Sequence, residues 1–172
     1  PLPMLYDGDY VSTWRLLEEF QRDGRARSIG VSNFQAGHLD RLAAETETVP
    51  AVNPIEAHPY FLTDETRAYG QDHGIVTQAW SPLAQGACLT DPAVVEIAAR
   101  QGRTPSQVIL RWHIQRGDVV FPKTTSPERM RENLDLFGFE LSVADMAALA
   151  ALDKGEPGRT GPHPDTFDFV PG

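Results

Sequence analysis

Cysteine, long apolar runs and positive charge are all scarce in this chain of 172 residues. Cys88 is the only cysteine, so no disulfide can form within the chain, and nothing points to a secreted, crosslinked scaffold. No apolar run approaches the roughly 20 residues that a membrane-spanning helix needs, and the N-terminus lacks the charged and apolar regions of a signal peptide. We therefore expect a cytoplasmic protein.

The charge balance is acidic, with 15 Lys and Arg against 24 Asp and Glu and a net charge of −9. Nucleic acid and anionic membrane surfaces would be repelled on average, so we expect neither as a partner. The 5 histidines include no pair at the helical i, i+4 spacing and no cysteine cluster accompanies them, so we predict no metal site. The length and the 41% hydrophobic content suit one compact unit with a core.

Short apolar runs alternate with longer amphipathic stretches, which is typical of strand and helix units around a parallel sheet. We predict strands at residues 28–31, 51–53, 75–80 and 119–121. We predict helices at residues 10–23, 38–46, 63–73, 91–101, 105–116, 127–136 and 142–152. In the first helix, Trp14, Leu16, Leu17 and Phe20 should form the apolar face.

The number and order of these elements predict the fold. A helix precedes the first strand, and the predicted strands are about half of those in an eight-stranded barrel. We therefore expect an α/β fold, the second half of a (β/α)8 TIM barrel, with the N-terminal half absent from this chain. Residues 1–153 should form the half-barrel and residues 154–172 a tail.

The last predicted strand leads into a segment typical of phosphate binding, VVFPKTTSPERMREN. Lys123 and Thr124 follow the strand, Ser126 is a good N-cap, and Pro127 suits the first helical position. Free N–H groups and the positive end of the helix dipole then face the same place as Lys123 and Arg129. The alternative is that these two cations are ordinary solvated surface charges.

Two earlier strand ends carry ligand-binding side chains as well. Ser32 and Asn33 offer a hydroxyl and a carboxamide that suit a ligand amide, and Trp80 offers a flat face for a planar heterocycle. Each has a structural interpretation too, Asn33 as a turn residue and Trp80 as part of the core. Because such side chains recur at successive strand ends, we favour a nicotinamide dinucleotide lying across a barrel mouth.

The chain also resembles the C-terminal half of an aldo-keto reductase over essentially its whole length. The segments that carry the resemblance, in order, are GRARSIGVSNF, PAVNPIEAHPYF, HGIVTQAWSPLAQG, PSQVILRW, VVFPKTTSPERMREN, FELSVADMAAL and RTGPHPDTF. The resemblance implies an oxidoreductase that transfers hydride between NADPH and a small aldehyde or ketone. Trp80, where many relatives carry tyrosine, is similar to the bacterial branch that reduces diketo sugar acids.

At the nicotinamide end, the resemblance implies that Ser32 and Asn33 hold the carboxamide and that Trp80 stacks on the ring. It also implies that Ser81 and Leu83 line the path of the pyrophosphate.

At the adenosine end, the resemblance implies that Lys123, Thr124 and Arg129 hold the 2′-phosphate and its neighbours. Glu132 and Asn133 would lie near the adenine. Contacts of this kind with the 2′-phosphate favour NADPH over NADH as the cofactor.

The sequence departs from the family pattern in two places. Asn53 is followed by Pro54, where the family usually has a glutamine that shares the nicotinamide amide, and proline has no side-chain donor or acceptor. The family's catalytic aspartate, tyrosine, lysine and histidine belong to its N-terminal half and have no matching position here. We therefore predict no catalytic residue on this chain and expect it to be inactive alone.

Two alternatives stay open. A non-catalytic half-barrel could bind a nucleotide or a protein partner, and its open strand edges would need self-association or the missing N-terminal half to cover them. A phosphate-binding barrel enzyme, such as a sugar-phosphate isomerase, explains Lys123 and Arg129 but gives no role to Asn33 and Trp80 together.

Three further features of the sequence give expectations of their own. The segment RTGPHPDTF resembles the family's C-terminal stretch that folds over the barrel mouth, and Phe167, Phe169 and Val170 could dock it, whereas a disordered terminus is the alternative. His58, at a strand exit, could face substrate, and Cys88 should be inert because nothing near it in sequence lowers its pKa.

Overall fold

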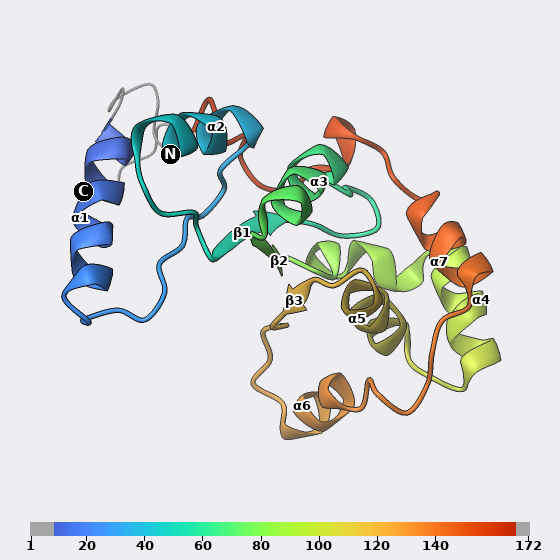
Figure 1. Ribbon diagram of the computed structural model, residues 1–172. Coiled ribbons are helices and arrows are strands. Elements are labelled where there is room, and N and C mark those ends of the chain that lie inside the picture. Colours follow the sequence, from blue (N-terminus) through green and yellow to red (C-terminus); the bar gives the residue numbers. More distant parts are fainter. Residues whose placement is uncertain (1–8, 168–172) are drawn as a thin grey trace. The chain divides into compact units, whose positions relative to one another are not determined.

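The computed structural model describes residues 9–167, and Figure 1 shows the course of the chain. The α-helices are α1 (Asp9–Arg22), α2 (Ala36–Glu45), α3 (Asp64–His73), α4 (Pro92–Gln101), α5 (Pro105–Gln115), α6 (Pro127–Leu134) and α7 (Val143–Ala150). The strands are β1 (Val52–Glu56), β2 (Val76–Trp80) and β3 (Val119–Val120), and 3₁₀ helices span Ala84–Thr90 and Glu156–Gly158. Each predicted helix is confirmed to within about two residues at either end.

The helix-start signals predicted for α6 act as expected, and α7 is capped as well. The Ser126 hydroxyl accepts the N–H of Arg129 at 3.3 Å, and Pro127 begins α6. At α7, Ser142 and Asp145 form a capping box, in which the Ser142 hydroxyl accepts the Asp145 N–H at 3.1 Å and the Asp145 carboxylate accepts the Ser142 N–H at 3.1 Å.

The described strands form one sheet in the order β1-β2-β3. Strands β2 and β3 pair in parallel, with Gln78 opposite Val119 and Ala79 opposite Val120. The α/β class is therefore confirmed, and among residues 9–167 the sheet has three strands and stays open. Within the same residues, no helix combines the length and the apolar character that crossing a bilayer requires.

The predicted strand at residues 28–31 does not form a regular strand. Its backbone runs beside β1, where the Ala51 N–H donates to the Ile29 carbonyl at 2.8 Å and the Val31 N–H donates to the Val52 carbonyl at 3.0 Å. A regular parallel ladder would return the second bond to residue 51, so the register slips by one residue. Gly30 permits the close approach, because a Cβ there would lie 2.5 Å from Val52 Cγ1.

The chain divides into two compact units, each with its own core. The first unit takes in the described parts of residues 1–55, 64–77 and 161–172. Its core consists of Val11, Trp14, Ile29, Phe34, Leu39, Leu42 and Ile75. The second unit takes in residues 56–63 and 78–160. Its core consists of Leu62, Ala84, Cys88, Val94, Ile97, Ala98, Val108, Ile109, Trp112, Leu141 and Leu149.

Helix α1 buries the predicted face only in part: Trp14 is buried and Leu17 packs partly buried against the core, whereas Leu16 is 50% exposed. Val11, Trp14 and Glu18 are buried at the i, i+3, i+7 spacing of a single helical stripe. The Glu18 carboxylate is satisfied there, since its Oε1 accepts the N–H groups of Glu47 at 2.9 Å and Thr48 at 2.6 Å. Burial of Glu18 therefore follows from hydrogen bonding to a loop distant in sequence, which an apolar pattern does not reveal.

Candidate functional site

The strand-to-helix segment after β3 opens a pocket in the second unit with a volume of about 320 Å³. Strand β3 ends beside α5, and the loop after it crosses to the start of α6, as Figure 1 shows. Six of the predicted binding residues line the pocket, namely Leu83, Lys123, Thr124, Arg129, Glu132 and Asn133. Leu89, Thr104, Pro105, Ser106 and Pro122 complete the lining and were not predicted as binding residues.

Two positively charged side chains line the pocket near the start of α6. Lys123 and Arg129 are exposed, and neither forms an ion pair with any residue in the described part of the chain. Thr124 lies between them in sequence, and its Oγ1 accepts the N–H of Ser126, the N-cap of α6. A hydroxyl, two cations and a helix N-terminus within one concave site suit a phosphate group.

Glu132 adds one anion to the same pocket. Its Oε1 accepts hydrogen bonds from the hydroxyls of Thr104 and, at 2.7 Å, Ser106. The Thr104 hydroxyl bond, followed by the Ser106 bond, lowers the pKa of Glu132, while partial burial opposes them and the charge of Arg129 adds to the lowering. Glu132 is thus ionised at neutral pH and can act only as a hydrogen-bond acceptor.

Helix α6 is held in place by polar contacts, because it buries none of its own side chains. Gln107 of α5, only 5% exposed, donates from Nε2 to the carbonyls of Glu132 at 3.2 Å and Asp135 at 3.1 Å. Arg111, also on α5, donates to the Leu136 carbonyl at 3.2 Å just past the end of α6. The orientation of Arg129 and Glu132 therefore depends on hydrogen bonds from α5 rather than on apolar packing.

Ser32 and Asn33 belong to the first unit, where they form a tight turn after the irregular stretch beside β1. Asn33 has a φ of 58°, in the left-handed region that asparagine tolerates better than most residues. The Asn33 N–H donates to the Pro54 carbonyl at 2.8 Å. Pro54 thus supports the turn through its backbone, even though its side chain cannot replace the polar group of a glutamine.

Trp80 and Ser81 stand at the end of β2 and do not line the 320 Å³ pocket. Trp80 is half-buried, and its carbonyl accepts the Ala57 N–H at 3.4 Å. Ser81 has a φ of 50°, and its carbonyl accepts the Ala84 N–H at 2.8 Å, so the chain turns sharply there. The prediction that Trp80 stacks on a ligand ring stays a prediction.

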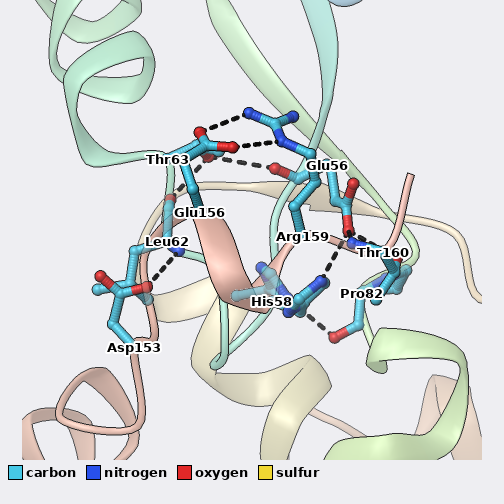
Figure 2. Close-up of polar contacts among 10 residues, drawn as sticks. Glu56, His58, Leu62, Thr63, Pro82, Asp153, Glu156, Arg159 and Thr160 are labelled. Atoms are coloured by element: carbon cyan, nitrogen blue, oxygen red, sulfur yellow. Dashed lines mark hydrogen bonds and ion pairs between the residues drawn. The ribbon is translucent and has the colours of Figure 1, made fainter. Parts of the chain in front are cut away.

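A buried polar cluster ties the C-terminal part of the second unit to the end of β1 (Figure 2). Glu56 Oε1 accepts the N–H and the hydroxyl of Thr160, each at 2.6 Å, and lies 3.0 Å from His58 Nε2. Glu56 is 2% exposed and His58 is fully buried. His58 therefore does not face an open cavity, and its role here is to support Glu56.

The residues before Thr160 pack along the loop that follows β1. Arg159 bonds the Glu156 carboxylate at 2.8 Å, as Figure 2 shows, and its guanidinium lies 4.4 Å from the centroid of the Phe61 ring. The Lys154 N–H donates to the Tyr60 carbonyl at 3.0 Å. Further on, Phe167 is 37% exposed, whereas Phe169 and Val170 lie outside the described residues.

Two further side chains that can titrate, Cys88 and His113, are buried inside the second unit. Cys88 is fully buried in the core of the second unit, and burial raises the pKa of its thiol to about 11. His113 is fully buried between the Asp118 carboxylate, 2.9 Å from Nδ1, and the Pro82 carbonyl, 3.3 Å from Nε2. It thereby supports the segment between Ser81 and Leu83.

The sequence of this chain is similar to those of known proteins. Residues 3–154 match the profile of the aldo/keto reductase family. An aldo-keto reductase of Mycolicibacterium smegmatis is 47% identical over 98% of this chain and 60% of its own length. A glyoxal reductase of Bacillus subtilis is 46% identical over 93% of this chain and 57% of its own length.

The fold of this chain is also similar to that of a solved structure. A variant of the protein Gox0644, crystallised in complex with NADPH, is 45% identical and has a TM-score of 0.93, with 98% of this chain and 62% of that chain covered. The chain thus spans about three-fifths of the length of the relatives it matches.

Proposed function

The chain belongs to the aldo/keto reductase family, and from that premise we propose that its 320 Å³ pocket binds the adenosine 2′-phosphate end of NADPH. The observation that carries the proposal is the meeting of Lys123, Arg129 and Glu132 in one concave site. The NADPH complex of Gox0644, a relative 45% identical to this chain, supports the choice of cofactor.

The donor set of the pocket fits this part of the cofactor. Lys123, Thr124 and Arg129 offer positive charge and a hydroxyl to the 2′-phosphate, while Glu132 and Asn133 line the same pocket and offer acceptors to the adenine. The volume is near the lower limit of ligand pockets, about 300 Å³, so the pocket suits the adenosine half rather than a whole dinucleotide.

For the nicotinamide half we propose the residues that the family resemblance assigns. Asn33 with Ser32 would hold the carboxamide, Trp80 would stack on the ring, and Ser81 with Leu83 would line the pyrophosphate path. Bound NADPH supplies the hydride that reduces an aldehyde or ketone. The residues of this chain bind and orient the cofactor, and none of them is assigned to proton transfer.

We propose further that residues 1–153 are the C-terminal half of the family's (β/α)8 barrel and that residues 154–172 form the tail over its mouth. Three-fifths coverage of the relatives supports this reading. The open edge of β3, where Val119 is 45% exposed, also supports the proposal of a half-barrel. A second copy or an N-terminal half would cover that edge. The carbonyl substrate class is supported by the name of the Bacillus subtilis relative, glyoxal reductase.

Two measurements on the 172-residue chain test the proposal. In a fluorescence titration, NADPH should bind and NADH should bind much more weakly, and equal affinities would contradict the adenosine 2′-phosphate assignment. In a turnover assay with a small dicarbonyl, the purified chain should not oxidise NADPH. Turnover in a sample whose mass spectrum excludes a second polypeptide would overturn the proposed inactivity and favour a catalytic chain over a binding half-barrel.

A further inference from the structure

Two hydroxyl groups in the pocket converge on a single oxygen of Glu132. Thr104 caps the start of α5, where its Oγ1 accepts the Gln107 N–H at 3.2 Å, and it donates its own proton to Glu132 Oε1. Ser106, two residues on, donates to the same Oε1 at 2.7 Å. Both hydroxyls line the pocket.

The count of donors and acceptors leaves one oxygen of Glu132 available. A hydroxyl has one proton, so Thr104 and Ser106 each have none left after donating to Oε1. Oε2 makes no hydrogen bond to any residue within the described range, and Glu132 lines the pocket. A carboxylate oxygen accepts but cannot donate, so its ligand must bring an N–H or O–H group.

The two positively charged side chains of the pocket restrict how a ligand can lie in it. Lys123 and Arg129 attract the phosphate, which leaves Glu132 and Asn133 as the side chains of α6 that can meet the base, and of these two only Glu132 carries a charge. Adenine presents an exocyclic amine, which donates. A purine base without that amine has no donor at this position, so it leaves the carboxylate oxygen without a partner.

We propose that Thr104 and Ser106 are positioning residues that give this pocket its preference for an amino-bearing base, because they fix Glu132 as an acceptor whose second oxygen meets the ligand. This inference rests on the proposed function, and it adds two residues for which the family resemblance gave no role. Without the hydroxyls, the Glu132 side chain would be free to change rotamer and its hold on the base would weaken.

The test compares two ligands that differ only by that exocyclic amine, adenosine 2′,5′-bisphosphate and purine riboside 2′,5′-bisphosphate, by calorimetric titration of the 172-residue chain. The wild-type chain should prefer the adenosine form by about tenfold or more. Ser106→Ala removes one donor and leaves the Thr104 cap intact, so it should reduce this ratio by about threefold or more. Thr104→Ser keeps the hydroxyl and should retain the ratio.

A Glu132 variant and a thermal-melting measurement distinguish an effect on the position of Glu132 from an effect on folding. Glu132→Ala removes the carboxylate acceptor altogether and should lower the ratio further than Ser106→Ala does. Thermal melting should show little change for Ser106→Ala. If either Ser106→Ala or Glu132→Ala leaves the ratio unchanged, the inference fails, while the proposed phosphate contacts of Lys123 and Arg129 stand. If the wild-type chain binds neither bisphosphate, the proposed function fails and the inference with it.

Discussion

The side chain of Asn53 hydrogen-bonds both backbone groups of Phe34. Its Nδ2 donates to the Phe34 carbonyl at 2.8 Å, and its Oδ1 accepts the Phe34 N–H at 3.2 Å. Asn53 is 4% exposed, so water cannot replace either bond. Since Asn33 precedes Phe34 in a left-handed conformation, with a φ of 58°, the amide of Asn53 stabilises the turn that presents Ser32 and Asn33.

Replacement of Asn53 by alanine should therefore destabilise the first unit. Asn53→Ala leaves a buried N–H and a buried carbonyl of Phe34 without partners, which should lower the free energy of unfolding by about 2–4 kcal/mol. Urea unfolding followed by circular dichroism measures the effect. Ser32→Ala, at an exposed neighbouring position, is the control and should change stability by less than about 0.5 kcal/mol. Equal midpoints for Asn53→Ala and wild type would show that the amide is dispensable.

Gly158 is predicted to be intolerant of any side chain. A Cβ at Gly158 would lie only 1.8 Å from the Tyr60 carbonyl oxygen, so Gly158→Ala must push the backbone away from Tyr60 and weaken the Lys154 bond to the same carbonyl. Hydrogen exchange should quicken by about tenfold or more at the Lys154 N–H. Gly37→Ala is the matched control, because a Cβ at Gly37 has no atom within 4 Å and alanine favours a helix. Unaltered exchange in Gly158→Ala would refute the predicted contact.

Acid should destabilise the protein in part through His113. Burial lowers the pKa of His113, and the neighbouring Asp118 only partly offsets it. The unfolded chain therefore takes up a proton near pH 6.5 that the folded chain does not, so stability falls as pH decreases below about 6.5 and levels off below the folded pKa. The slope from this one group is at most about 1.4 kcal/mol per pH unit.

Urea midpoints measured between pH 7.5 and 5 test this sign. His113→Gln should be less stable than wild type at pH 7.5 yet lose less stability on acidification. A residual slope is expected from His38, whose pKa is also lowered by burial, with Asp165 opposing. The assignment to His113 is wrong if the variant and wild type show parallel pH profiles.

Features set by neighbouring residues in sequence were predicted well. Ser126 and Pro127 start α6 as expected, because a cap is satisfied within one helical turn. The segment from Lys123 to Asn133 likewise formed one side of a pocket, because a strand end and the following helix start are adjacent by connectivity.

Features set by distant contacts were not predicted. Leu16 was assigned to the buried face of α1, but the partners of Glu18 lie about 30 residues away, at Glu47 and Thr48. Thr104 and Ser106 were missed as pocket residues, because they meet Glu132 across 28 and 26 residues. The sequence Thr104-Pro105-Ser106-Gln107 does carry a capping-box signal, which marks a helix start but does not reveal which side chain its hydroxyls will meet.

The most direct test of the central claim compares NADPH and NADH binding to wild type, Arg129→Ala and Arg131→Ala, the last being an exposed arginine of α6 outside the pocket lining. Loss of one charge-assisted phosphate contact should weaken NADPH by about 1.5–3 kcal/mol, or roughly 10- to 150-fold, in Arg129→Ala alone. NADH should be nearly unaffected in both variants. Equal weakening of NADPH and NADH by Arg129→Ala, or no weakening of either, would contradict the assignment of this pocket to the adenosine 2′-phosphate.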